Sequence, residues 1–182
     1  MAIRLSGIVM ESIVDGPGIR RAVFAQGCDH RCPGCHNKQT WDKSGGFSME
    51  PGEIVEKMRQ NPLLRGITLT GGEPFLQPEG MAELAQIARD NGYDVVAYTG
   101  YKFEDLIQKG GGQSQIRSML KLVDLLIDGL YEQADRRLEL PFRGSLNQRL
   151  VLARQSLNEG KLVTLDESRL YEPFPSIHIM ME

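Results

Sequence analysis

Cysteine is scarce in this chain, with only three in 182 residues. All three lie between residues 28 and 35, in the segment Cys-Asp-His-Arg-Cys-Pro-Gly-Cys. No cysteine elsewhere could pair with them in a disulfide or complete a site of four thiolates. The clustered thiols are therefore expected to serve a metal centre or a reaction, and three ligands would leave one position of the centre open.

The sequence also lacks a long apolar run and an excess of positive charge. No segment approaches the roughly 18 apolar residues of a membrane span, and the first residues show no signal-peptide pattern. The net charge of −3 gives no electrostatic case for nucleic acid binding. We expect one cytoplasmic domain over residues 1–182, without a membrane or nucleic acid partner, and with a poorly ordered tail from about residue 171.

Arginines are nevertheless concentrated locally, between residues 136 and 149, with acidic residues among them. A solvated surface and a docking face for a protein partner are both compatible with this mixture of charges. The sequence does not decide between them.

The hydrophobic pattern predicts alternating strands and helices. Strands are expected over Ile3–Met10, Arg20–Gly27, Gly66–Thr70, Asp94–Thr99 and Leu122–Asp128, with further ordered segments at Arg149–Arg154 and Lys161–Asp166. Helices are expected over residues 50–60, 79–91, 102–109 and 114–121, the first with Ser48 as a possible N-cap.

This alternation indicates an α/β fold with mainly parallel strands. A closed barrel needs eight strand–helix units in about 250 residues, so a partial, open-sided (β/α) barrel fits this length better. Functional groups are then expected on the turns that follow the strands. These turns are the cysteine loop, Gly71-Gly-Glu-Pro74, Thr99-Gly100 and Asp128.

The cysteines alone admit three interpretations. Structural zinc would want a fourth ligand, for which only the cramped neighbours His30 and His36 are at hand. A redox dithiol would use Cys32-Pro-Gly-Cys35 and leave Cys28 without a purpose. An iron–sulfur cluster held by three thiolates accounts for all of them and leaves one iron free for a small molecule.

The segment Gly71-Gly-Glu-Pro74 also has two interpretations. It can be an ordinary turn between a strand and a helix, with Pro in the first helical turn. Alternatively, two residues without a Cβ let the backbone approach a ligand's polar head closely. The ammonium and carboxylate of an amino acid would suit such a turn, and the nearby cysteine loop favours this second interpretation.

The order C-x3-C-x2-C, then G-G-E-P after the next strand, resembles the radical S-adenosylmethionine superfamily. The segment from Ser12 to Arg20 is similar to activating enzymes of glycyl-radical enzymes, and the whole resemblance spans residues 12–148. Within that group, the chain resembles activators of anaerobic ribonucleotide reductases. Four segments carry this resemblance: Cys32-Pro-Gly-Cys35-His-Asn37, Thr40-Trp41, Tyr98-Thr-Gly-Tyr101 and Arg143-Gly-Ser-Leu-Asn-Gln148. The chain departs from the superfamily at Gly34, where an aromatic residue is common.

This resemblance implies that Cys28, Cys32 and Cys35 hold a [4Fe–4S] cluster whose free iron binds S-adenosylmethionine. Further contacts to S-adenosylmethionine are implied for Gly34, Cys35, His36, Gly71, Gly72 and Glu73. His36 would cover the adenine, although a solvent-facing role is the other possibility. Residues implied to position the partner's glycine loop are Asp15, Gly16, Arg20, Asp128, Arg143 and Asn147; Asp128 could equally be a turn former.

The implied activity is formation of a glycyl radical on the large subunit of an anaerobic ribonucleotide reductase. No side chain need act as an acid or base, and a reduced flavodoxin or ferredoxin would supply the electron. Two alternatives keep this chemistry: an activase of a pyruvate formate-lyase-like enzyme and a small-molecule radical enzyme. A non-catalytic zinc-binding interaction module is the alternative from a different class.

Overall fold

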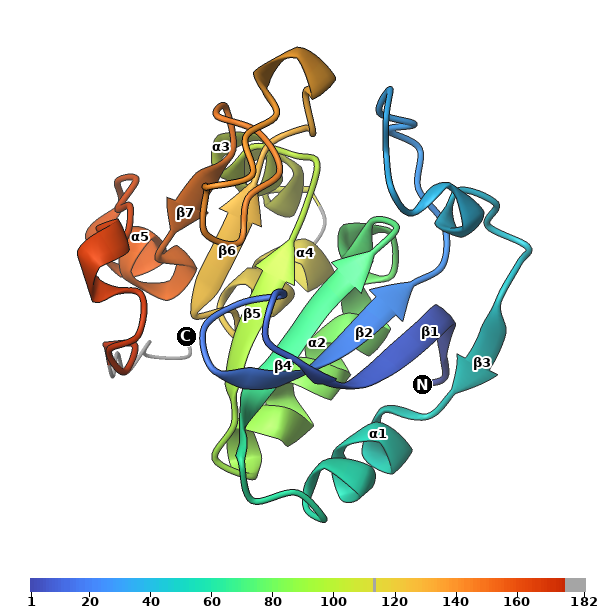
Figure 1. Cartoon of the computed structure of the whole chain (residues 1–182). Helices are drawn as coiled ribbons and strands as arrows, with labels where there is room; N and C mark the ends of the chain where they lie inside the picture. Colours follow the sequence, from blue (N-terminus) through green and yellow to red (C-terminus); the bar gives the residue numbers. More distant parts are fainter. Residues whose placement is uncertain (113, 176–182) are drawn as a thin grey trace.

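The computed structural model describes residues 1–112 and 114–175. One seven-stranded sheet runs through the molecule in the order β3-β1-β2-β4-β5-β6-β7 (Figure 1). The strands are β1 (Ile3–Ser12), β2 (Ile19–Ala25), β3 (Phe47–Met49), β4 (Leu64–Gly71), β5 (Asp94–Tyr98), β6 (Leu125–Asp128) and β7 (Arg149–Val151). The helices are α1 (Pro51–Met58), α2 (Pro78–Asp90), α3 (Phe103–Gly110), α4 (Ser114–Leu120) and α5 (Ala153–Glu159).

The centre of the sheet is parallel and its edges are antiparallel. Strands β2, β4, β5 and β6 pair in parallel, whereas β1 pairs antiparallel with β2 and β3, and β7 with β6. The edge strands β3 and β7 do not pair with each other, so the sheet stays open. The expected α/β class and open-sided sheet are confirmed, with more antiparallel edge than the sequence suggested.

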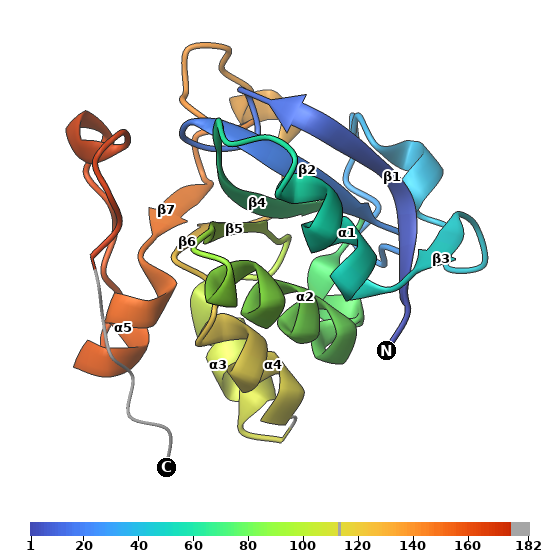
Figure 2. The ribbon, with the colours of Figure 1, turned by 90° about the horizontal axis from the view of Figure 1, so that it is seen from below.

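Helices α1 to α4 cover one face of the sheet (Figure 2). Their buried apolar side chains pack against those of the strands, as with Met81 and Leu84 of α2 facing Ile67 and Leu69 of β4. A smaller cluster around Val96 occupies the other face, where loops cover the sheet. Among the described residues, no helix has the length and apolarity needed to cross a membrane.

Several expected boundaries need correction. Ser48 lies in β3 and caps nothing; the residue before α1 is Glu50, and Pro51 begins the helix. Strand β6 starts at Leu125, because the residues before it close the turn after α4, including Leu122 N–H to Met119 O at 3.0 Å. Residues 149–154 contain β7 and the start of α5, and the segment 161–166 contributes only one bridge, Thr164 to Val151.

The tail expected to be poorly ordered is partly placed. The Arg65 guanidinium carbon lies 4.9 Å from the centroid of the Phe174 ring. This part of the tail therefore packs against the start of β4. Residues 176–182 lie outside the described part of the chain.

Candidate cluster and S-adenosylmethionine site

The carboxyl ends of β2, β4, β5 and β6 meet at one edge of the sheet, where the turns expected to carry function converge. A cavity of about 260 Å³ lies there, and all three cysteine side chains line it. Its other lining residues come from the turns after β4, β5 and β6 and include Thr70, Gly71, Gly72, Thr99, Gly100, Gly129, Tyr131 and Gln148. The cysteine loop, the Gly71–Gly72 turn and the Thr99–Gly100 turn therefore line one cavity, whereas of the turn after β6 it is Gly129, not the predicted Asp128, that lines it.

The cysteine loop starts directly after β2 and folds back on itself. Gly27 N–H donates to Thr40 O at 2.7 Å, and Cys28 N–H donates to Trp41 O at 3.3 Å. Inside the loop, Cys35 N–H donates to Cys32 O at 3.1 Å. Arg31 has a φ of +50°, a left-handed conformation that non-glycine residues adopt rarely. Backbone hydrogen bonds within residues 27–41 therefore help to bring the three cysteines to one cavity.

The thiols differ in their surroundings. Cys28 is buried, whereas Cys32 and Cys35 are half-buried. Burial raises the pKa of the Cys28 and Cys32 thiols above the ordinary value. Metal ligation requires thiolates, so iron binding here releases protons that the apolar surroundings otherwise hold on sulfur.

The Gly-Gly-Glu-Pro turn is fastened to the end of β2. Gly72 N–H donates to Ala25 O at 2.9 Å and Glu73 N–H to Gly27 O at 2.8 Å. A Cβ on Gly71, whose φ is +94°, would lie 2.6 Å from Phe24 Cα, and one on Gly72 would lie 2.3 Å from Gly27 O. The structure therefore explains both glycines by close approach of the neighbouring backbone, a cause that the sequence interpretation did not include.

The Glu73 carboxylate is 1% exposed and is shared among four hydrogen-bond donors. Phe75 N–H lies 3.0 Å from Oε1, Gly100 N–H lies 2.9 Å from Oε2, and the Thr99 hydroxyl lies 3.0 Å from both oxygens. His30 Nε2 lies 2.9 Å from Oε2. Only the backbone of Glu73 is thus left to meet a ligand in this conformation, while its side chain ties β4, β5 and the cysteine loop together.

His30 is the member of this group that comes from the cysteine loop itself. Its ring packs edge-on against Tyr101 at 4.5 Å between centroids. A Cβ on Gly100 would stand 2.5 Å from the ring, so only glycine at position 100 admits it. His30 entered the sequence analysis as a possible zinc ligand; its neighbours make it instead the anchor between the loop and β5.

Gly34 and His36 lie where the loop meets the segment after β6. Gly34 has a φ of +75°, and a Cβ there would collide with the Gln133 side chain at 2.7 Å. His36 lines the cavity, and its ring centroid is 6.1 Å from that of Tyr131. A position beside the cavity is compatible with a contact to S-adenosylmethionine, which stays a prediction.

Two residues predicted to position the partner lie inside the protein. Arg20 is 0% exposed and binds Asp94, Thr68 Oγ1 and Ile67 O, with the ion pair at 2.6 Å. Asp128 is also 0% exposed; its carboxylate accepts from Phe103 N–H at 2.7 Å and pairs with Arg149 at 2.5 Å. Both side chains are therefore enclosed by the protein in this structure, and their part in positioning a partner stays a prediction.

Of the other predicted docking residues, Asp15, Arg143 and Asn147 are partly exposed, whereas Gly16 is buried. Asp15 lines the cavity and accepts from the Ser12 hydroxyl at 2.5 Å. Gly16 is buried against the Arg20 side chain. Arg143 forms an ion pair with Glu167, and Asn147 Nδ2 donates to Leu130 O at 2.7 Å. Their contacts to a partner remain predictions.

Sequence reasoning assigned no site role to Trp41 or Tyr131, both of which line the cavity. Trp41 has a buried indole N–H for which the described residues provide no hydrogen-bond acceptor. Tyr131 and Gln148 reach the cavity from the long segment between β6 and β7. Gln148 belongs to the Arg143–Gln148 motif, whose residues are candidates for positioning the partner, and the Thr40-Trp41 motif was an available signal for Trp41, but no pattern marks Tyr131.

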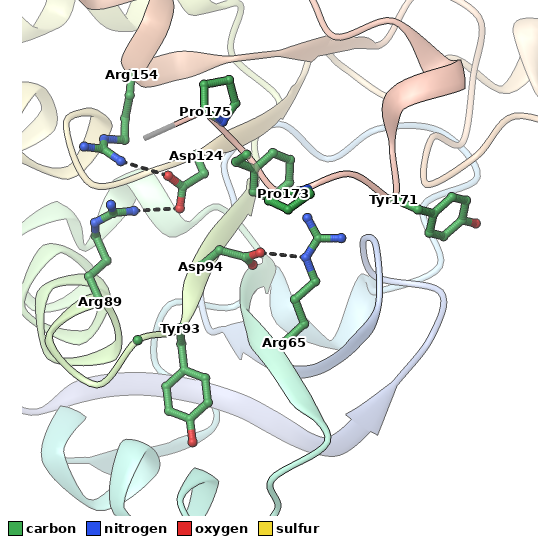
Figure 3. Close-up of a pocket in the computed structure, with 11 residues that line it drawn as sticks. Arg65, Arg89, Tyr93, Asp94, Asp124, Arg154, Tyr171, Pro173 and Pro175 are labelled. Carbon is green, nitrogen blue, oxygen red and sulfur yellow. Dashed lines mark hydrogen bonds and ion pairs between the residues drawn. The ribbon is translucent and has the colours of Figure 1, made fainter. Parts of the chain in front are cut away.

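A second, larger hollow of about 720 Å³ lies at the opposite end of the sheet (Figure 3). Its carboxylates are already paired: Asp94 with Arg65 at 2.8 Å, and Asp124 with Arg89 at 2.6 Å and Arg154 at 3.1 Å. Arg65, Asp94 and Asp124 lie at the amino ends of the parallel strands β4, β5 and β6, whereas Arg89 and Arg154 reach them from α2 and α5. The cysteine cavity, not this hollow, therefore carries the chemistry.

The donor set of the cysteine cavity fits an iron–sulfur cluster. Three separate thiols around one cavity match a cluster, in which each thiolate binds a different iron.

Comparison with known proteins agrees with this geometry. Residues 14–151 match the family described as "4Fe-4S single cluster domain". The chain is 40% identical over 144 residues to the anaerobic ribonucleoside-triphosphate reductase-activating protein of Enterobacteria phage T4, covering 75% of this chain and 86% of that one. Identity to the protein of that name from Escherichia coli K12 is 36% over 146 residues, covering 75% and 90%.

Two further similarities are partial. The pyruvate formate-lyase-activating enzyme of Clostridium pasteurianum is 34% identical over 129 residues, covering 68% of this chain but 50% of that enzyme. The crystal structure of QueE from Escherichia coli superposes with a TM-score of 0.44 and 20% identity, covering 55% of this chain and 53% of that one. By its cluster-domain match and its near full-length relatives, the chain belongs to the family of anaerobic ribonucleoside-triphosphate reductase-activating proteins, within the radical S-adenosylmethionine superfamily.

Proposed function

We propose that this protein activates an anaerobic ribonucleotide reductase by generating a glycyl radical on it. The observation that carries the proposal is the joining of the cysteine loop to the Gly-Gly-Glu-Pro turn around one cavity. When bound, a [4Fe–4S] cluster and S-adenosylmethionine supply one-electron cleavage of the sulfonium, and the resulting 5′-deoxyadenosyl radical takes a hydrogen atom from the partner's glycine.

The protein's own residues bind and orient the reactants. Cys28, Cys32 and Cys35 hold the cluster from one side of the cavity. The backbone of Gly71 and Gly72 forms the facing wall, at a spacing fixed by their hydrogen bonds to β2. Glu73 keeps the two walls in register through His30 and Gly100. Such fixed positioning, rather than acid–base catalysis, is what a radical reaction requires of the protein.

The glycyl-radical partner is proposed to be a reductase rather than a pyruvate formate-lyase-like enzyme. The relatives named as reductase activators are covered over 86% and 90% of their length, whereas the lyase-activating enzyme is covered over half. The cysteine count supports the same choice, since three cysteines leave none for additional clusters.

The electron is proposed to come from a reduced flavodoxin or ferredoxin. Reduction of a sulfonium requires a potential toward the low end of the range of roughly −700 to +450 mV covered by iron–sulfur clusters. The cytoplasm is the proposed location, because clustered free thiols persist there in reduced form.

The first test is an EPR spectrum of the anaerobically reconstituted and reduced protein, recorded with and without S-adenosylmethionine. A [4Fe–4S] signal that changes shape on addition is expected. A signal indifferent to S-adenosylmethionine would leave an electron carrier, and a protein carrying zinc without acid-labile sulfide would remove the proposal.

The second test adds the reductase and measures 5′-deoxyadenosine together with the glycyl radical signal. Replacement Cys32→Ala removes a cluster ligand and should abolish 5′-deoxyadenosine formation. Retained formation of 5′-deoxyadenosine in this variant would contradict the assignment of the site.

A further inference from the structure

We propose that an exposed apolar surface beside the cavity docks the segment of the reductase that carries the glycine. This surface, the apolar rim, consists of Ile13, Val14, Leu138, Leu140 and Phe142. The inference rests on the proposed function and adds to it the place and the chemistry of partner binding.

The rim brings two distant segments of the chain side by side. Ile13 and Val14 follow β1, whereas the other three side chains belong to the β6–β7 loop, residues 130–148. Together with Arg143 they line one shallow hollow of about 370 Å³. The exposed fractions of the Ile13, Val14 and Leu138 side chains are 73%, 70% and 83%. Such contact of apolar side chains with water is unfavourable and is relieved when a partner covers them.

The rim continues into the cysteine cavity. Asp15, which follows Val14, and Gly144, which follows Arg143, both line that cavity. A peptide lying on the rim therefore reaches the place where the radical forms without crossing other surface. An exposed apolar patch elsewhere on the molecule would not have this continuity.

The β6–β7 loop is held in shape before any partner binds. Phe142 O accepts from the Tyr98 hydroxyl at 2.8 Å, and Leu146 N–H donates to Asp135 O at 3.0 Å. Arg136 and Ser145 form a bridge across the loop. Long connections between sheet strands are uncommon unless they serve a function, and an ordered one lowers the entropy lost on binding.

The same loop also packs on the cysteine loop. The Gln133 side chain lies where a Cβ of Gly34 would be, at 2.7 Å, and Tyr131 stands near His36. A peptide that binds the β6–β7 loop would therefore contact a segment that packs directly against the cysteine loop.

The chemistry of the rim identifies its occupant as an apolar peptide segment. Among the described residues that line the hollow, Arg143 is the single cation, and it is paired with Glu167, so it adds little net charge for an acidic partner. Apolar side chains flanking the partner's glycine would fill the hollow and place the glycine, which has no side chain, over the cavity mouth. A second copy of this chain is the competing occupant.

The experiment compares the double variant Ile13→Asp/Leu138→Asp with the matched control Leu63→Asp. Leu63 is also highly exposed, at 70%, but lies before β4 at the other end of the sheet. All three substitutions replace exposed side chains, so folding is expected to survive, and the thermal unfolding midpoint checks this. Binding to the large reductase subunit is measured by titration, and the glycyl radical by EPR.

We expect the double variant to bind the reductase about tenfold or more weakly, since charged groups in an apolar contact remove its hot-spot energy. Its 5′-deoxyadenosine formation without the reductase reports on the cluster site separately. The control variant should match the unmodified protein in both measurements.

The possible outcomes distinguish failure of the apolar rim as a docking site from failure of the proposed function. Wild-type binding and glycyl radical yield in the double variant would overturn the apolar rim as the docking site. A change in self-association with unaltered reductase binding would assign the rim to a second copy and overturn it equally. If the unmodified protein cleaves S-adenosylmethionine but never forms a glycyl radical on the reductase, the proposed function itself fails.

Discussion

Glu73 is the residue on which the geometry of the site depends most. Its carboxylate joins the end of β4, the end of β5 and the cysteine loop through contacts of 2.9 to 3.0 Å. Both oxygens act as acceptors, and a carboxylate has acceptor positions only. The residue therefore has a structural reason to be acidic that is independent of any ligand.

Replacement Glu73→Gln tests this reason. The amide group cannot accept on both sides, so a buried donor such as Phe75 N–H loses its partner at a cost of about 1–3 kcal/mol. We expect lower stability in urea and slower or incomplete reconstitution of iron.

Glu79→Gln is the matched control, because it removes the same charge from an exposed position in the first turn of α2. Equal stability and iron content in the two variants would show that the Glu73 contacts contribute nothing beyond charge.

At the scale of elements, the contact between the ends of β2 and β4 sets the distance between the two walls of the cavity. Gly71 belongs to this contact and has a φ of +94°. Gly92, with a φ of +83°, has open space around its missing Cβ. The two glycines therefore share a backbone conformation and differ in their neighbours.

Replacement of each by alanine separates the two effects. Gly92→Ala should cost only the left-handed backbone strain of about 1–2 kcal/mol. Gly71→Ala should cost more and lower the iron content after reconstitution, because its Cβ would force β2 and β4 apart. Urea unfolding of both variants makes the comparison, and similar losses would contradict a role for the strand contact.

The central strands could be predicted from the sequence to within a few residues, because they are short buried segments rich in apolar and β-branched residues. The edge strand β3 could not, since Phe47 and Ser48 are exposed and show no such pattern. The position of the cavity followed from the motifs and the fold class. The inward side chain of Glu73 and the burial of Arg20 did not, because both depend on pairings across the sheet that a linear pattern does not contain.

At the scale of the whole molecule, the two ends of the sheet have different roles, one in the candidate site and the other in stability. The carboxyl ends of the strands carry the cavity, and the amino ends carry ion pairs (Figure 3). Asp124 is 6% exposed, accepts from Val95 N–H at 2.9 Å and pairs with Arg89 and Arg154. It thereby connects α2, β5 and α5 far from the cysteines.

Asp124→Ala should lower the free energy of unfolding by about 3 kcal/mol, because it removes the buried carboxylate that Arg89, Arg154 and Val95 N–H share. Under conditions where the variant is folded, its iron content and the EPR response to S-adenosylmethionine should match those of the unmodified protein.

Asp90→Ala, at an exposed position of α2, is the control and should change stability little. Loss of the cluster in folded Asp124→Ala would show that the two ends of the sheet are coupled after all.

The confinement of all cysteines to residues 28–35 also bears on the order of events during synthesis. Ribosomes release this loop well before the turn at 71–73 and the loop at 130–148 that enclose it. A nascent chain thus presents its thiols openly to iron and sulfide donors, whereas the finished fold buries Cys28. Cluster loading is expected to be easiest during translation, and repair of an oxidised cluster to require local opening of the mature protein.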